Sequence, residues 1–268
     1  MRIVLLLAAS ACLMAAIMLH LSQLEGRLLR ADANAIPSNA VLMAFASGRG
    51  AALFEAHCTA CHGSGGQGDP ARGIPALSDG DWLYGKGSVS DIEQIVKYGI
   101  RSNHPKAWNL AIMPAYGTAR PSARDANIPS LSPANIRDLV EFLTREQGSE
   151  GHGNSADGAA AARGAELFAG AGGCYDCHAA DGKGDSAIGA PNLTDGITLY
   201  GGSRQSLWMS IAYGRHGMCP AWVSRIRPAG IREVVLFVYS LSHPHGSASA
   251  AEPAAAVLAL AAASPVRR

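Results

Sequence analysis

Hydrophobic residues form one long run at the N-terminus of the chain. The run extends from Ile3 to Leu19 and spans 17 residues, about the length that crosses a bilayer as a helix. Because this is longer than the apolar core of a typical cleaved signal, we predict an uncleaved signal-anchor within residues 1–30, with the bulk of the chain outside the cytoplasm. The alternative is a cleaved signal, for which Ala33-Asn34-Ala35 is a small-residue site.

Helical patterns further along the chain are shorter and are separated by glycine-rich loops. After Ser132-Pro133, apolar residues recur on one helix face at Ile136, Leu139, Val140 and Leu143. A similar segment follows Arg227-Pro228, and proline suits the first turn of a helix. Short middle helices are expected at about 89–98 and 203–213.

These elements belong to two copies of one module. The first copy begins G-A-A-L-F-E-A-H-C-T-A-C-H at Gly50, and the second begins G-A-E-L-F-A-G-A-G-G-C-Y-D-C-H at Gly164. The cysteine pairs lie 116 residues apart, and the same offset relates Pro75 to Pro191. An internal repeat of this kind indicates one structural unit used twice.

The repeat predicts an all-α fold of two tandem domains behind one N-terminal transmembrane helix. The first domain is expected over residues 45–146 and the second over 163–244. A Gly-, Ser- and Ala-rich linker is expected over 147–162. An Ala- and Pro-rich low-complexity tail is expected over 245–268.

Composition excludes several functions. Only 16% of the 268 residues are charged and the formal net charge is +1, which argues against a nucleic-acid binder. Six cysteines are too few for a disulfide scaffold of this length. Four of them form two C-x-x-C pairs, so their spacing matters more than their number.

Each C-x-x-C pair is followed directly by histidine, which is the attachment pattern of c-type haem. The residues are Cys58, Cys61 and His62 in the first copy and Cys174, Cys177 and His178 in the second. Two thiols about one helical turn apart can add to the two vinyl groups of one porphyrin, and the adjacent imidazole can bind the iron. Because the motif recurs within a repeat, we predict two covalently bound haems rather than a zinc site or a redox dithiol.

We call the helices that start at Pro133 and Pro228 the closing helices. The sixth iron ligand is expected from the loop that precedes each of them. In the first copy Met113 stands in I-M-P-A-Y, and His/Met ligation suits electron transfer. In the second copy Cys219 stands directly before the proline and Met218 one residue earlier. Three outcomes are therefore open for the second haem: ligation by Met218, ligation by Cys219, or a five-coordinate iron.

Other residues are expected to support the haems. A ligating imidazole usually donates its second N–H to a carbonyl, and the carbonyls of Pro75 and Pro191 stand 13 residues after each histidine. Aromatic side chains that could line a haem edge are Trp82, Tyr84 and Tyr200. A weaker signal is that Arg101 and Arg215, after the middle helices, could pair with haem propionates.

With these residues in hand, the chain resembles the dihaem subunit III, of CcoP/FixP type, of cbb-type haem–copper oxidases. The resemblance runs from about Gly48 to His243 and includes D-W-L-Y-G (81–85), G-A-P-N-L-T-D (189–195) and G-R-H-G (214–217). The family pattern has methionine before the second proline, where this chain has Cys219.

The resemblance implies an all-α fold of two tandem class I cytochrome c domains behind one N-terminal transmembrane helix. It also implies an electron-transfer subunit that is not catalytic alone. It implies a donor cytochrome, an oxidase core and a monohaem cytochrome subunit as partners, in the bacterial inner membrane with the haem domains in the periplasm. One alternative is a free-standing membrane dihaem cytochrome that serves a dehydrogenase or reductase. Another is a haem enzyme or ligand-binding protein with an open or thiolate-ligated second haem.

Overall fold

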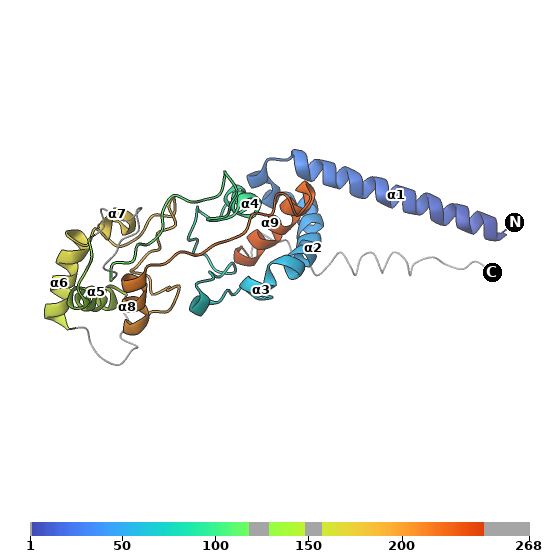
Figure 1. Ribbon diagram of the computed structural model, residues 1–268. Helices are drawn as coiled ribbons and strands as arrows, with labels where there is room; N and C mark the ends of the chain where they lie inside the picture. Colours follow the sequence, from blue (N-terminus) through green and yellow to red (C-terminus); the bar gives the residue numbers. More distant parts are fainter. Residues whose placement is uncertain (1, 118–128, 148–156, 244–268) are drawn as a thin grey trace.

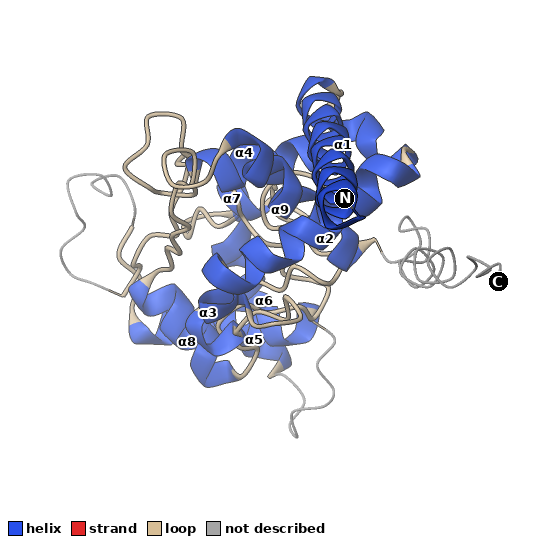
Figure 2. Cartoon of the chain, turned by 90° about the vertical axis from the view of Figure 1, so that its right-hand side faces the viewer, coloured by secondary structure: helices blue, strands red, loops and turns tan. Residues whose placement is uncertain are grey.

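The computed structural model describes residues 2–117, 129–147 and 157–243. Within these ranges the fold is all-α, with helices joined by long loops and isolated β-bridges in place of strands (Figure 2). The N-terminal helix is α1 (Arg2–Arg30), and the helices of the first copy are α2 (Ala40–His57), α3 (Thr59–His62), α4 (Val89–Tyr98) and α5 (Pro133–Glu146). Those of the second copy are α6 (Gly158–Ala169), α7 (Tyr175–His178), α8 (Arg204–Tyr213) and α9 (Pro228–Ser242).

Two short 3-10 helices complete the elements, η1 (Ala33–Ser38) and η2 (Pro70–Arg72). Polar side chains cap most of the longer helices, for example Ser132, which forms a capping box with Asn135 before Pro133 at the start of α5. The predicted middle helices are present as α4 and α8, and the predicted closing helices as α5 and α9. Residues 158–162, expected in the linker, are instead the first turns of α6, because Asp157 caps that helix by accepting from the backbone N–H groups of Ala159 and Ala160.

The helices pair across the repeat rather than within each copy. Helix α2 of the first copy packs along α9 of the second, and α6 of the second copy packs along α5 of the first. The middle helices follow the same rule, since α4 contacts α9 and α8 contacts α5. We call the group formed by α2, α3, α4 and α9 unit 1, and the group formed by α5, α6, α7 and α8 unit 2. Figure 1 shows unit 2 at the left end and unit 1 between unit 2 and α1.

The two units have separate hydrophobic cores. The core of unit 1 joins Phe54 of α2 to Val234 and Val235 of α9, and these side chains are at most 1% exposed. The core of unit 2 joins Leu139 of α5 to Phe168 of α6. Unit 2 is therefore built from one continuous stretch of chain, whereas unit 1 is built from two stretches that flank it.

A glycine sets the closest approach of each helix pair. A Cβ atom at Gly50 would collide with the carbonyl of Glu233, and one at Gly164 would collide with the carbonyl of Asp138. The neighbouring arginines add matched ion pairs: Arg49 Nε lies 2.6 Å from Glu233, and an Arg163 nitrogen lies 2.7 Å from Asp138. Equivalent residues therefore make equivalent contacts in both units.

The N-terminal helix α1 has one long exposed part and one end that packs on unit 1. It is long and apolar enough to cross a membrane, and most of its large apolar side chains before residue 20 are exposed. At its other end, Leu24 and Leu28 are buried in the core of unit 1, and Glu25 pairs with Arg227 at 2.6 Å. The tail expected over 245–268 lies outside the described residues.

Candidate functional site

The first C-x-x-C-H motif starts where helix α2 ends. Cys58 caps α2, and His62 closes the single turn of α3. The chain then loops back so that Nδ1 of His62 lies 3.2 Å from the carbonyl oxygen of Pro75. This is the hydrogen bond expected of a metal-binding imidazole, and it leaves Nε2 for the metal.

The second motif repeats this geometry. Cys174 precedes α7, which His178 closes, and Nδ1 of His178 lies 3.0 Å from the carbonyl oxygen of Pro191. The loop between histidine and proline has the same internal bonds in both copies: the N–H of Gly68 donates to His62 and that of Gly184 to His178, both at 2.9 Å.

Burial shifts the pKa values of the histidine and of the first cysteine in each motif. It lowers the pKa of His62 and of His178 below the ordinary value, although the hydrogen bonds to the proline carbonyls act in the opposite direction. Both imidazoles are therefore held neutral, the form that binds a metal. Burial also raises the pKa of the Cys58 and Cys174 thiols to about 11.

The distal residues face the motif of the other copy. Met113 packs against the core of unit 2 together with Cys174 and Leu193. It is held by Arg215, with which it exchanges two backbone hydrogen bonds of 3.1 and 3.2 Å. The linear repeat predicts that Met113 faces His62, and this pairing is wrong because the segment that carries Met113 belongs to unit 2.

Cys219 lies in unit 1. Trp222, on the same segment, packs against His57, which directly precedes the first motif, with ring centroids 5.3 Å apart, so the Cys219 segment lies beside that motif. Burial raises the pKa of the Cys219 thiol to about 11. Its backbone exchanges hydrogen bonds of 2.9 and 3.0 Å with Ile100. The open question about a distal sulfur ligand therefore concerns the first C-x-x-C-H motif, not the second. The neighbouring Met218 is 72% exposed.

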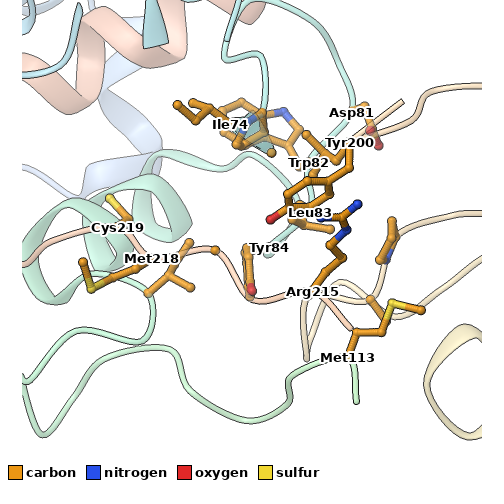
Figure 3. A pocket seen from close by; sticks show the side chains of 18 of the residues that line it. Ile74, Asp81, Trp82, Leu83, Tyr84, Met113, Tyr200, Arg215, Met218 and Cys219 are labelled. Atoms are coloured by element: carbon orange, nitrogen blue, oxygen red, sulfur yellow. The ribbon is translucent and has the colours of Figure 1, made fainter. Parts of the chain in front are cut away.

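Two tyrosines and two arginines lie between the distal residues. In Figure 3, Cys219 lies on one side of Tyr84 and Arg215, and Met113 lies on the other. The Arg215 guanidinium stacks on the ring of Tyr200, 4.0 Å from its centroid.

Arg101 ties this cluster to the backbone. Its Nη2 donates to the Tyr84 hydroxyl at 2.6 Å, and its other nitrogens donate to the carbonyls of Ala111 and Gly217 at 2.8 and 2.6 Å. Neither Arg101 nor Arg215 has a carboxylate partner among the ion pairs of the described residues. Within the described part of the chain, both positive charges are therefore available to a ligand with carboxylate groups.

Each tyrosine also reaches into the loop of the other copy. The ring of Tyr84 fills the space where Gly189 would carry a Cβ, and the ring of Tyr200 does the same at Gly73. Sequence reasoning did not single out these glycines, although the 116-residue offset that relates the tyrosines also relates Gly73 to Gly189. Side chains larger than glycine would displace both rings.

One cavity of about 550 Å³ is lined by both motifs. Its lining is mostly apolar and includes every residue that the sequence predicts to hold a haem: Cys58, Cys61, His62, Pro75, Trp82, Tyr84, Met113, Cys174, Cys177, His178, Pro191, Tyr200, Met218 and Cys219. Two neutral imidazoles with oriented rings, paired thiols, apolar walls and nearby guanidinium groups are the set of groups that c-type haem requires. The residues present therefore fit that group.

Comparisons with known proteins agree with this chemistry. Residues 47–145 match the sequence model of the cytochrome c family. The chain is 38% identical over 225 residues to the cbb3-type cytochrome c oxidase subunit CcoP of Rhodobacter capsulatus, which covers 81% of this chain and 69% of the relative. It is 37% identical to CcoP of Cereibacter sphaeroides, over 80% of this chain and 68% of the relative.

A third relative is the subunit FixP of a Bradyrhizobium species, which is 36% identical over 83% of this chain and 71% of its own length. The similarity spans both copies of the repeat, so it covers both motifs and the loops around them. The chain therefore belongs to the CcoP/FixP family of cbb3-type cytochrome c oxidase subunits and is a cytochrome c electron-transfer protein.

Proposed function

We propose that this chain carries two c-type haems, one in each unit, and passes electrons from a donor cytochrome to the catalytic core of a cbb-type oxidase. The observation that carries the proposal is the duplicated proximal site, in which both imidazoles bond to proline carbonyls at 3.2 and 3.0 Å and open on one cavity. Haem supplies an iron that alternates between the ferric and ferrous states and so carries one electron.

The chain's own residues would attach, orient and shield the haems. Cys58 and Cys61 would bind one porphyrin through thioether bonds, and Cys174 and Cys177 the other. The bonds from His62 and His178 to the proline carbonyls keep both rings in one orientation and add basicity to the ligating nitrogen. The apolar walls exclude water, which limits the reorganisation that a change of iron charge requires.

Arg101 and Arg215 would hold the haem propionates. Arg101 is fixed by three hydrogen bonds, and Arg215 is fixed by Tyr200 and by a 3.0 Å bond to the Ser210 hydroxyl. Fixed guanidinium groups form strong charge-assisted bonds with carboxylates. Trp82, which packs on the core of unit 1, would line a haem edge.

The N-terminal helix would anchor the chain in the bacterial inner membrane, with both units on the periplasmic side. The burial of Leu24 and Leu28 in unit 1 supports a helix that stays with the protein, because cleavage near Ala33-Asn34-Ala35 would remove part of that core. The same contacts support the placement of unit 1 nearer to the membrane than unit 2.

Affinity purification of the tagged full-length chain from native membranes tests the proposal. We expect a haem–copper core to accompany the chain, the preparation to oxidise reduced cytochrome c, and chemical assay to give two c-type haems per chain. Recovery of the chain alone would favour a free-standing cytochrome. Binding of carbon monoxide by the isolated ferrous chain would favour the ligand-binding alternative.

A further inference from the structure

We propose that the thiolate of Cys219 is the distal iron ligand of the haem carried by Cys58 and Cys61, so that the two haems of this chain have different ligands and different potentials. The inference rests on the proposed attachment of haem at both motifs. It departs from the expectation set by the linear repeat, which places Cys219 with the second haem.

The backbone around Cys219 is equivalent to that around Met113. Each residue precedes a proline, and each exchanges a pair of backbone hydrogen bonds with a residue just after a middle helix: Cys219 with Ile100, and Met113 with Arg215. The N–H to O distances are 2.9 and 3.0 Å for Cys219 and 3.1 and 3.2 Å for Met113. The same scaffold therefore presents a thiol in unit 1 and a thioether in unit 2.

A glycine permits the close approach in both places. Gly99 ends α4 and Gly214 ends α8, with φ angles of 78° and 70°. A Cβ at Gly99 would collide with the carbonyl of Cys219, and one at Gly214 would collide with the carbonyl of Met113. This match argues that the two sulfur-bearing positions are structural counterparts and that the cysteine has not been displaced from the ligand position.

The neighbouring methionine does not have this geometry. Successive side chains of an extended segment point to opposite sides, so Met218 and Cys219 diverge. Met218 is 72% exposed, and Figure 3 shows the two side chains leaving the chain in different directions. The Cys219 thiol shares its cavity with His62. Trp222, on the same segment as Cys219, packs against His57 just before the first motif, with ring centroids 5.3 Å apart.

Ligation by Cys219 has defined chemical consequences. One sulfur–iron bond forms and the thiol proton leaves to solvent, so that no oxidant or reductant is consumed. Thiolate pushes electron density onto the iron, whereas methionine raises the reduction potential. The first haem is therefore the harder of the two to reduce.

Spectra of the full-length ferric protein in detergent test the ligand. After chemical assay has given two haems per chain, we expect the near-infrared and EPR spectra to show one His/Met haem and one His/thiolate haem in equal amounts. Cys219→Met converts the thiolate signal into a second His/Met signal. The matched control Met218→Leu leaves both signals unchanged, and Met113→Leu removes only the His/Met signal.

Two further variants, which keep both haems attached, test whether the thiolate binds the first haem. Cys61→Ala and Cys177→Ala each leave one thioether and one free vinyl group, which shifts the visible band of that haem alone to longer wavelength. With a mild reductant such as ascorbate, we expect the shifted band to appear in Cys177→Ala but to need dithionite in Cys61→Ala. The reverse order places the thiolate on the second haem and overturns the assignment.

Two further results overturn the proposal. One is a wild-type spectrum with two His/Met signals, one of which Met218→Leu removes. The other is a thiolate signal that persists in Cys219→Met. Fewer than two haems per chain is a different result, because it contradicts the proposed function itself.

Discussion

Unit 1 and unit 2 are nearly identical on their proximal sides and differ in how the chain completes them. The ion pair between Arg163 and Asp138 in unit 2 joins residues 25 apart in sequence, whereas that between Arg49 and Glu233 in unit 1 joins residues 184 apart. The Glu233 side chain is 2% exposed and also contacts Arg227 at 3.0 Å, whereas the Asp138 side chain is 14% exposed. A duplicated module has thus given one local unit and one that depends on both flanks of the other.

This difference shows that a repeat in sequence need not be a repeat of separate domains. Helices α5 and α9 carry matching residues, so either of them can pack against α2 or against α6. Exchange of the two helices therefore keeps the contacts at the helix crossings. It also moves each distal segment to the other motif. The position before the second proline therefore lies with the first C-x-x-C-H motif.

Removal of α9 gives the largest expected effect. A chain that ends after His216 lacks Cys219 and the apolar face of α9, including Ile231 and Val234, which are 1% exposed. We expect its first haem to lose the low-spin signal almost completely, because helix α2 is left uncovered. The second haem should keep its His/Met absorption, and a chain that ends after His243 should show both signals.

The outcome separates two arrangements of the chain. If the copies were consecutive domains, the same truncation would damage the second haem and leave the first intact. Ferric absorption and EPR spectra of the two truncated proteins decide between these patterns, since the ligands proposed above give the two haems different signals.

The next largest effect is expected when the acidic residue where α2 crosses α9, or where α6 crosses α5, is neutralised. Glu233→Gln removes the charge from a buried carboxylate bonded to Arg49 and Arg227, which costs about 3 kcal/mol of unfolding free energy. Asp138→Asn acts on a more exposed pair and should cost clearly less. Guanidinium unfolding at pH 7, followed at the band of each haem, measures both losses.

Acid titration tests the ion pair between Arg163 and Asp138. The hydrogen bond from Arg163 holds the pKa of Asp138 below its usual range, so the contribution of Asp138 is complete above the ordinary carboxyl pKa and is lost as the pH falls through the lowered value. Stability of Asp138→Asn should therefore depend less on pH below about 4 than that of the wild type. Equal pH dependence in the two proteins would contradict this role of the pair.

Alanine at the crossing glycines gives the smallest expected effect. Gly50→Ala should destabilise unit 1, and Gly164→Ala unit 2, each by about 1–2 kcal/mol, because the methyl group forces the helices apart. Gly48→Ala is the control on the same helix. A Cβ there meets nothing within 4 Å, so this substitution should stabilise the protein by about 0.5–1 kcal/mol.

Denaturant unfolding watched at both haem bands measures these changes. Gly50→Ala should first weaken the signal of the haem in unit 1, and Gly164→Ala that of the haem in unit 2. Loss of the second haem's signal in Gly50→Ala would show that α2 belongs with unit 2, contrary to the observed packing.

The sequence was sufficient to predict the helices and the bonds from histidine to proline. These depend on local features, namely Pro133 and Pro228 at helix starts, the helical periodicity, and a fixed number of residues between His62 and Pro75. The linker was predicted too long, because the alanine-rich start of α6 resembles a linker in composition and forms a helix in structure.

The exchange of closing helices could not be predicted in this way. Gly50 and Arg49 match the residues of α9 as well as those of α5, so the repeat leaves two pairings equally favourable. The difference lies in the connections: 14 residues separate Gly99 from Met113, but only five separate Gly214 from Cys219. A five-residue segment spans at most about 18 Å when extended, which gives it little length to fold back over its own unit.

The chain order of the helices also sets the order in which the two haem sites are completed during synthesis. All helices of unit 2 lie between Pro133 and Tyr213, so they are made before α9. Unit 1 starts first and closes last, and its loop of 184 residues costs about 2 kcal/mol more closure entropy than the 25-residue loop of unit 2. Unit 1 therefore stays open until α9 is added, whereas unit 2 can close before it.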